Sequence, residues 1–94
     1  MAEHFVYILK CCDGTLYTGY TTDIPKRVSL HNQGKASKYT RSRLPALLVY
    51  VEPVESRSEG LKREYRIKRL SRAQKEQLIV RGALRLQEFL VSWE

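Results

Sequence analysis

Residues 5–21 read FVYILKCCDGTLYTGYT, and this stretch decides the fold. Two runs rich in β-branched and aromatic residues, 5–11 and 15–21, lie on either side of an Asp-Gly pair. Such residues favour strands, and an Asp-Gly pair between two such runs is a strong hairpin signal. The chain is therefore predicted to begin with two antiparallel strands.

The length of the hairpin loop decides which side chains share a face. A two-residue turn at the Asp-Gly pair would place Tyr7 and Tyr17 on opposite faces, because side chains alternate along a strand. A three-residue loop at 12–14 instead uses Gly14 in the left-handed conformation as a bulge. Tyr7 then pairs with Gly19, which leaves space beside the ring, and both phenols lie on one face. We expect this loop; the alternative for the two tyrosines is that they only pack.

Caps, apolar runs and helix breakers predict the rest of the fold. We expect a helix at 24–33 that is capped by Thr22 or Asp23 and ends at Gly34, and then a loop at 35–43. A strand at 46–54 follows, and a second helix runs from Ser56 or Ser58 to about residue 70. A third helix begins at Ser71, and apolar residues including Trp93 recur at helical spacing after Gly82. Ser71 and Gln74 have the spacing of a capping box. The predicted fold is α+β: one domain over 1–94, with a small three-stranded antiparallel sheet flanked by helices in the order β-β-α-β-α-α and room for a further C-terminal helix.

Positive charge is concentrated in one segment of the chain. The net charge is +7, and residues 35–72, with eleven Lys or Arg against four Glu, account for all of it. A positive field favours polyanions such as nucleic acid, although it also simply improves solubility. The candidate contacts to a nucleic-acid backbone are Lys35, Lys38, Arg41, Arg43 and Lys68.

Composition also predicts where the chain works. With 43% hydrophobic and 29% charged residues it is typical of a folded globular protein. No apolar run is long enough to cross a bilayer and the first four residues lack a leader pattern, so we expect a cytoplasmic protein. Cys11 and Cys12 are adjacent and no second pair exists, which favours reduced thiols over a disulfide or a zinc site.

Three polar side chains are predicted to face the sheet. Arg27 and His31 share a helical stripe with Ile24 and Val28, and a buried guanidinium needs a carboxylate, a phosphate or a water-lined cavity. A single His on the inward side of a helix usually has a structural role, but the presence of Arg27 one turn earlier favours a catalytic or ligand-binding role for His31. Glu64 lies on the inward arc of a later helix. The simpler explanation is an ion pair with Lys68, four residues later; the alternative is that Glu64 holds a divalent cation such as Mg²⁺.

Tyr7-Ile8 and Tyr17-Thr18-Gly19, followed by Arg27, His31 and Glu64, together resemble the GIY-YIG nuclease family. The resemblance runs from about residue 5 to about residue 78 and is closest to small stand-alone bacterial members that are catalogued as uncharacterised. It implies a metal-dependent endonuclease that hydrolyses phosphodiester bonds in DNA, with a role in repair or in processing DNA structures. Cleavage would leave a 3′-hydroxyl and a 5′-phosphate.

The resemblance also implies a role for each of the five positions. Tyr7 would activate or orient the attacking water, and Tyr17 would support it in the same network. Arg27 would stabilise charge on the phosphate, and His31 would position or deprotonate the nucleophile. Glu64 would be the sole protein ligand of one Mg²⁺ or Mn²⁺.

Two departures from the family pattern keep alternatives open. Many relatives carry a late Asn, whereas no Asn follows Glu64 here, so that role is missing or filled by a residue such as Gln74. Relatives with defined substrates usually have added DNA-binding domains, so a protein partner would supply target recognition. DNA is favoured over RNA as the substrate. The alternatives are a catalytically weak or inactive nucleic-acid-binding domain and a module whose basic segment binds an acidic protein.

Overall fold

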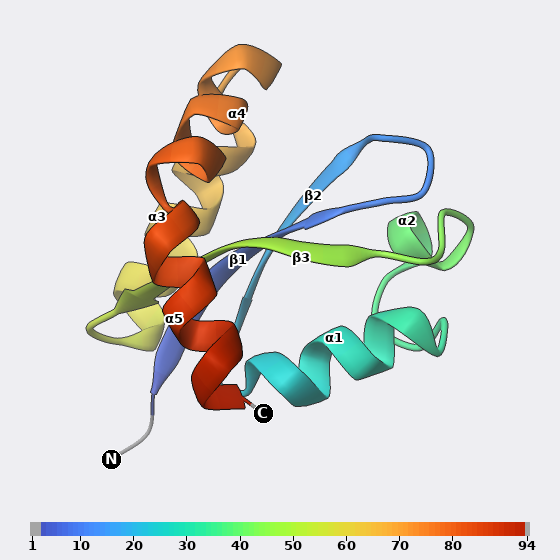
Figure 1. The fold of residues 1–94 in the computed structure, drawn as a ribbon, viewed down its shortest axis with the longest axis horizontal. Coiled ribbons are helices and arrows are strands. Elements are labelled where there is room, and N and C mark those ends of the chain that lie inside the picture. The colour runs from blue at the N-terminus through green and yellow to red at the C-terminus, as the bar shows by residue number, and fades with distance from the viewer. Residues whose placement is uncertain (1–2, 94) are drawn as a thin grey trace.

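The computed structural model describes residues 3–93 (Figure 1). Its elements are β1 (His4–Lys10), β2 (Leu16–Thr21), α1 (Ile24–Asn32), α2 (Lys38–Arg41), β3 (Leu47–Val54), α3 (Arg57–Lys68), α4 (Arg72–Arg81) and α5 (Ala83–Trp93). The strands form one antiparallel sheet in the order β2-β1-β3. The predicted α+β architecture is confirmed, including the further C-terminal helix.

Some sequence-based expectations concern residues at the two ends of the chain. Met1 and Ala2, which belong to the segment expected to lack a leader pattern, lie outside the described residues, and so does the side chain of Trp93. Within residues 3–93, no helix combines the length and the apolar character needed to span a membrane.

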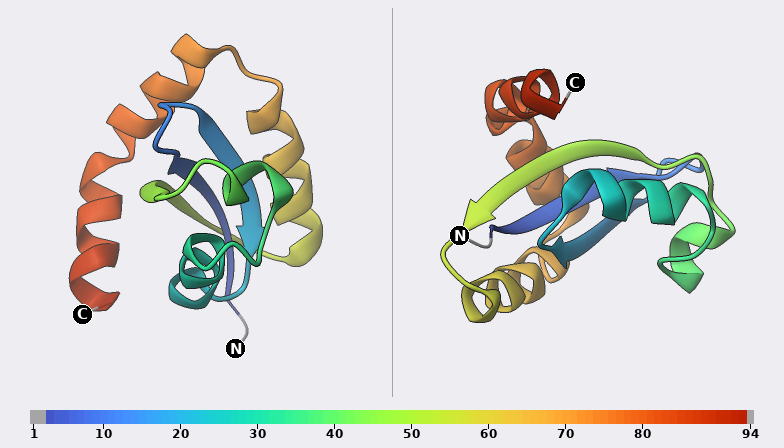
Figure 2. Two further views of the ribbon diagram at one scale, coloured as in Figure 1. Left: turned by 90° about the vertical axis from the view of Figure 1, so that its right-hand side faces the viewer. Right: turned by 90° about the horizontal axis from the view of Figure 1, so that it is seen from below.

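Helices cover both faces of the sheet, so its central strand β1 is buried on both sides (Figure 2). On the face covered by α1 and α5, the buried core residues are Phe5, Tyr7, Leu9, Ile24, Ala46 and Val51. On the face covered by α3 and α4, they are Val6, Ile8, Tyr50 and Ile67. Alternate residues of β1 therefore belong to two separate cores, and Tyr7 belongs to the one beneath α1.

The hairpin has the predicted three-residue loop. Tyr7 pairs with Gly19 and Leu9 pairs with Tyr17. Gly14 has a φ of +84°, in the left-handed region, and its N–H donates to the Cys11 carbonyl at 2.9 Å. Tyr7 and Tyr17 consequently lie on the same face of the sheet, as the shared-site hypothesis requires.

The predicted helix ends are also confirmed. Asp23 caps α1 through its side chain, and Gly34 after that helix has a φ of +75°. Ser56 caps α3, and Ser71 forms the capping box with Gln74 at the start of α4. These features follow from short-range chemistry, because each cap satisfies backbone N–H groups within one turn.

The segment 35–43, expected to be a loop, contains the one-turn helix α2. The Ser37 hydroxyl accepts a hydrogen bond from the Tyr39 N–H at 3.1 Å, which caps this turn. Thr40 is completely buried, and its hydroxyl contacts His31 of α1, which fixes the turn to the rest of the protein. A single turn is too short to show a 3.6-residue apolar period, so the sequence pattern did not reveal it.

Candidate active site

The hydroxyl of Tyr7 reaches over the edge strand of the sheet at Gly19. Tyr7 is 1% exposed, and a Cβ at position 19 would lie 2.5 Å from its Oη. No real side chain tolerates that distance. Since Gly19 lies in β2, which has a neighbour on one side only, the missing side chain lets the phenol point toward the free edge of the sheet.

A chain of hydrogen bonds runs from Tyr7 through α1 to α2. Tyr7 Oη lies 2.8 Å from His31 Nε2, and His31 Nδ1 lies 2.8 Å from Thr40 Oγ1. The Thr40 hydroxyl in turn donates to the Ser37 carbonyl at 3.4 Å, because a carbonyl oxygen only accepts. Thr40 therefore accepts from His31 Nδ1–H. This leaves a lone pair on Nε2, so Tyr7 donates its hydroxyl proton to His31.

Burial keeps both members of this pair neutral. Burial, together with the smaller effect of the positive charge of Arg27, lowers the pKa of His31 to about 4. Burial raises the pKa of Tyr7 above its ordinary value, with Tyr17 and, more weakly, Glu64 adding to the rise and Arg27 opposing it. At neutral pH the pair is a phenol bonded to an imidazole, not an ion pair.

Ring contacts and charge effects on pKa values connect the five predicted site residues. The charge of Arg27, which is partly exposed on α1, lowers the pKa of both Tyr7 and His31. The charge of Glu64 on α3 raises the pKa of Tyr7. The Tyr17 ring meets the His31 ring edge-on, with centroids 5.1 Å apart. Tyr7, Tyr17 and His31 are thus in direct contact with one another, and the charges of Arg27 and Glu64 influence the Tyr7 phenol from α1 and α3.

Glu64 forms the predicted pair one turn along its helix. Its carboxylate lies 2.9 Å from Lys68 Nζ, and its side chain is 18% exposed compared with 51% for the lysine. Within residues 3–93, no three His, Cys, Asp or Glu side chains gather as metal ligands. A cation here would therefore depend on one or two side chains. That suits Mg²⁺, which takes one or two carboxylates and completes its shell with waters and phosphate oxygens.

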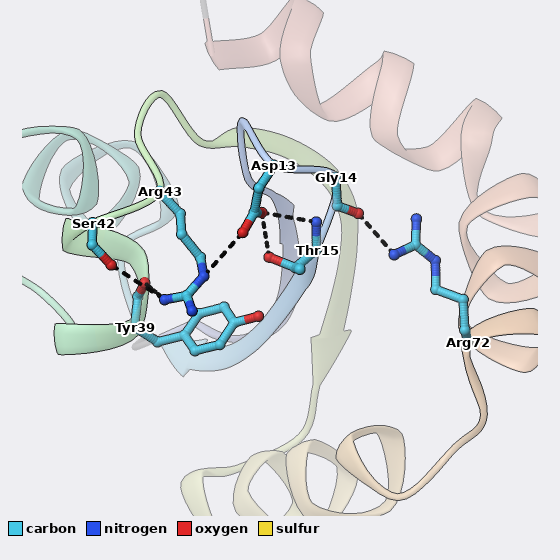
Figure 3. A network of polar contacts seen from close by, with 7 residues as sticks. All are labelled: Asp13, Gly14, Thr15, Tyr39, Ser42, Arg43 and Arg72. Atoms are coloured by element: carbon cyan, nitrogen blue, oxygen red, sulfur yellow. Dashed lines mark hydrogen bonds and ion pairs between the residues drawn. The ribbon is translucent and has the colours of Figure 1, made fainter.

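The basic residues predicted to contact nucleic acid differ in their surroundings. Lys35, Lys38 and Arg41 are exposed on and before α2. Arg43 is engaged within the protein, because its Nε lies 3.0 Å from Asp13 and its Nη1 donates to the Tyr39 carbonyl at 2.7 Å (Figure 3). Arg43 thereby ties α2 to the hairpin loop, a structural function that its charge alone did not suggest.

Sequence reasoning missed Thr40 and Tyr39. Thr40 fixes the orientation of His31, and Tyr39 stacks on Tyr17 with ring centroids 6.1 Å apart. Both belong to the short helix that was expected to be a loop. The available signal was weak: one hydroxyl and one aromatic residue inside a strongly basic segment.

Sequence comparisons match this chain to known proteins. Residues 3–77 match the family model of the GIY-YIG catalytic domain. A UPF0213 protein of Halobacterium salinarum is 59% identical over 75 residues, covering 80% of this chain and 97% of that protein. Another, from Staphylococcus haemolyticus, is 54% identical over 79 residues, covering 84% of this chain and 96% of that protein.

Solved structures show the same fold. The solution NMR structure of a UPF0213 protein from Bacillus halodurans is 48% identical and superposes with a TM-score of 0.57, covering 86% of each chain. A protein from E. faecalis, also solved by NMR, is 39% identical with a TM-score of 0.57, covering 97% of this chain and 90% of that one. The resemblance drawn from the motifs is confirmed, and the chain belongs to the GIY-YIG family of nuclease-type domains.

Proposed function

We propose that this protein is an endonuclease that hydrolyses phosphodiester bonds in DNA with the help of one Mg²⁺ or Mn²⁺. The observation that carries the proposal is the buried 2.8 Å hydrogen bond from Tyr7 to His31, and the charges of Arg27 and Glu64 both influence the phenol. Membership of a nuclease-type family, whose enzymes are generally dependent on divalent metals, supports it. The proposed setting is repair or processing of DNA structures in the cytoplasm.

The Tyr7–His31 pair gives the attacking water a path for its proton. Tyr7 already donates to Nε2, so its oxygen has lone pairs free to accept a proton from water. As the water oxygen bonds to phosphorus, its proton passes to Tyr7 while the original phenol proton passes to His31. No free tyrosinate forms, so the raised pKa of Tyr7 is no obstacle. His31 is 1% exposed with both nitrogens engaged, and therefore acts through Tyr7.

Arg27 couples this proton path to the substrate. In the free protein its positive charge disfavours a charged His31. A phosphodiester anion beside the guanidinium offsets that charge, so substrate binding raises the proton affinity of His31. Arg27 also stabilises the negative charge that develops on the phosphate, and the Tyr17 ring holds His31 in place.

Glu64 is the proposed cation-binding residue. Its partly buried carboxylate pairs with an exposed lysine that a cation would displace, and the cation, when bound, stabilises negative charge on the phosphate and on the leaving oxygen. The P–O3′ bond breaks, the leaving oxygen takes up a proton from solvent water, and the products carry a 3′-hydroxyl and a 5′-phosphate. Lys35, Lys38, Arg41, Arg43 and Lys68 are the proposed backbone contacts, with a protein partner supplying target recognition.

A cleavage assay tests this proposal. Full-length protein is incubated with Mg²⁺ or Mn²⁺ and single-stranded, duplex, flap and branched DNA, with matched RNA, alongside Glu64→Ala. We expect cation-dependent cleavage of DNA by the wild type and none by the variant. Cleavage that persists in Glu64→Ala would indicate a contaminant and remove the enzymatic claim. Salt-dependent binding without cleavage would support an inactive nucleic-acid-binding domain instead.

A further inference from the structure

A cavity next to Tyr17 has no part in the proposed chemistry. It has a volume of about 230 Å³ and is lined by Leu16, Tyr17, Thr18, Tyr39, Lys68 and Lys75. Three of these residues belong to the edge strand β2, so the cavity lies along the free edge of the sheet. Because Tyr17 and Lys68 belong both to this cavity and to the surroundings of Tyr7 and Glu64, the cavity adjoins the proposed active site.

One side of the cavity is cationic. Lys68 comes from the end of α3 and Lys75 from the first turns of α4. Glu64 lies 2.9 Å from Lys68 and offsets its charge, and Glu76 lies 3.5 Å from Arg72, whereas the Lys75 ammonium makes no ion pair with any residue that the structure describes. The ammonium group of Lys75 therefore favours an anionic ligand, and the position of Lys68 on a separate helix suits an extended one.

The other side of the cavity is aromatic. Tyr39 and Tyr17 stack with an interplanar angle of 25°, and the Arg43 guanidinium lies 4.0 Å from the centre of the Tyr39 ring. Tyr39 remains 38% exposed although it is held by both neighbours. Nucleobases stack on such rings, whereas an acidic peptide would need only the cations.

Both walls are fixed to the same hairpin loop (Figure 3). Arg43 reaches Asp13 from the α2 side at 3.0 Å, and Arg72 Nη1 donates to the Gly14 carbonyl from the α4 side at 2.7 Å. The aromatic wall and the cationic wall are thus braced against one element. A site whose walls are held in advance loses less conformational entropy when a ligand binds.

We propose that this cavity binds the nucleotide next to the scissile phosphodiester, with its base against Tyr39 and a phosphate on Lys75. The inference rests on the proposed function and names how that site holds its strand. The volume is below the ~300–1,000 Å³ typical of pockets that enclose a drug-sized molecule, which suits one nucleotide of a longer chain.

Fluorescence anisotropy of the full-length protein with a labelled short oligothymidylate tests the proposal, in EDTA so that cleavage does not interfere. Tyr39→Ala should lower affinity for this strand by at least about fivefold, but not for an abasic strand of the same length, and Tyr39→Phe should bind as the wild type does. Lys75→Gln should reduce the slope of log affinity against log salt by about 0.7. Lys62→Gln, which removes an exposed lysine that lines a different cavity, should leave it unchanged.

The outcomes separate the two proposals. If the wild type binds no oligonucleotide even at low salt, the proposed function itself fails. If it binds, but Tyr39→Ala and Lys75→Gln bind as Lys62→Gln does, only the nucleotide site is overturned. Among the residues that the structure describes, the Lys75 side chain makes no hydrogen bond or ion pair, so Lys75→Gln remains informative if Tyr39→Ala unfolds. Polyglutamate binding that is lost in Lys75→Gln, with oligothymidylate binding unchanged, would assign the cavity to an acidic protein segment and overturn the proposal.

Discussion

Replacing Thr40 with valine tests the hydrogen-bond chain at its far end. Valine keeps the shape of the threonine side chain but removes the oxygen that accepts from His31 Nδ1–H at 2.8 Å. His31 then has two options. It keeps that tautomer with an unpaired buried N–H, or it moves the proton to Nε2 and donates to Tyr7, which reverses the Tyr7–His31 hydrogen bond.

The expected effects follow from these two options. Leaving a buried donor unpaired costs about 1–3 kcal/mol, so the free energy of unfolding of Thr40→Val should fall by that amount. The reversed tautomer cannot accept the phenol proton, so the rate of DNA cleavage should fall by about 10²–10⁴-fold, the usual contribution of general-base catalysis. Thr40 is fully buried and touches no substrate, so DNA affinity should not change.

Three measurements check this prediction: urea unfolding, single-turnover cleavage, and ¹⁵N NMR of the imidazoles, with His4→Gln to assign the signals. The wild type should carry its His31 proton on Nδ1, and Thr40→Ser should restore both the tautomer and the rate. The reasoning is refuted if the wild type carries the proton on Nε2. It is equally refuted if Thr40→Val cleaves at the wild-type rate.

Three further perturbations test other parts of the account. Folding lowers the pKa of His31 from 6.5 to about 4, so its contribution to stability is complete above pH 6.5 and is lost as the pH falls toward 4, by on the order of 3 kcal/mol. In urea unfolding, the free energy of unfolding of His31→Gln should not show this dependence on pH, whereas that of His4→Gln should. Equal pH dependence in the wild type and both variants would contradict the burial argument. Gly19→Ala should displace the Tyr7 ring and lower the free energy of unfolding by about 1–3 kcal/mol, and wild-type stability would show that the ring has room to move. Glu64→Ala should abolish Mn²⁺ binding measured by electron paramagnetic resonance while changing stability by at most about 0.5 kcal/mol; retained Mn²⁺ binding would remove Glu64 as the ligand.

Much of the fold could be predicted because its signals are local. Gly14 in the hairpin loop and the Ser71 capping box each satisfy backbone groups within a few residues, so residue type alone identifies them. Because side chains alternate along a strand, the three-residue loop then placed Tyr7 and Tyr17 on one face of the sheet, without knowledge of the rest of the chain.

The finer parts of the site could not be predicted, because they depend on contacts between distant segments. Helical periodicity turned His31 inward, but nothing in the sequence indicated that Thr40, on a helix of one turn, would meet it. Charge likewise identified a basic segment without distinguishing Arg43, which braces the hairpin through Asp13, from exposed lysines. Helical periodicity predicted that Glu64 lies on the inward side of its helix. Its influence on Tyr7 depends on how α3 packs against the sheet, which the sequence did not indicate.

The most direct test of the central claim is single-turnover DNA cleavage by Tyr7→Phe. This variant removes one oxygen atom and keeps the ring in the core, and Tyr65→Phe, at a tyrosine that is 62% exposed, is the matched control. If Tyr7 passes a proton from water to His31, the Tyr7→Phe rate falls by about 10²–10⁴-fold, with unchanged DNA affinity and with Tyr65→Phe at the wild-type rate. Cleavage by Tyr7→Phe at the wild-type rate would contradict the proposed mechanism.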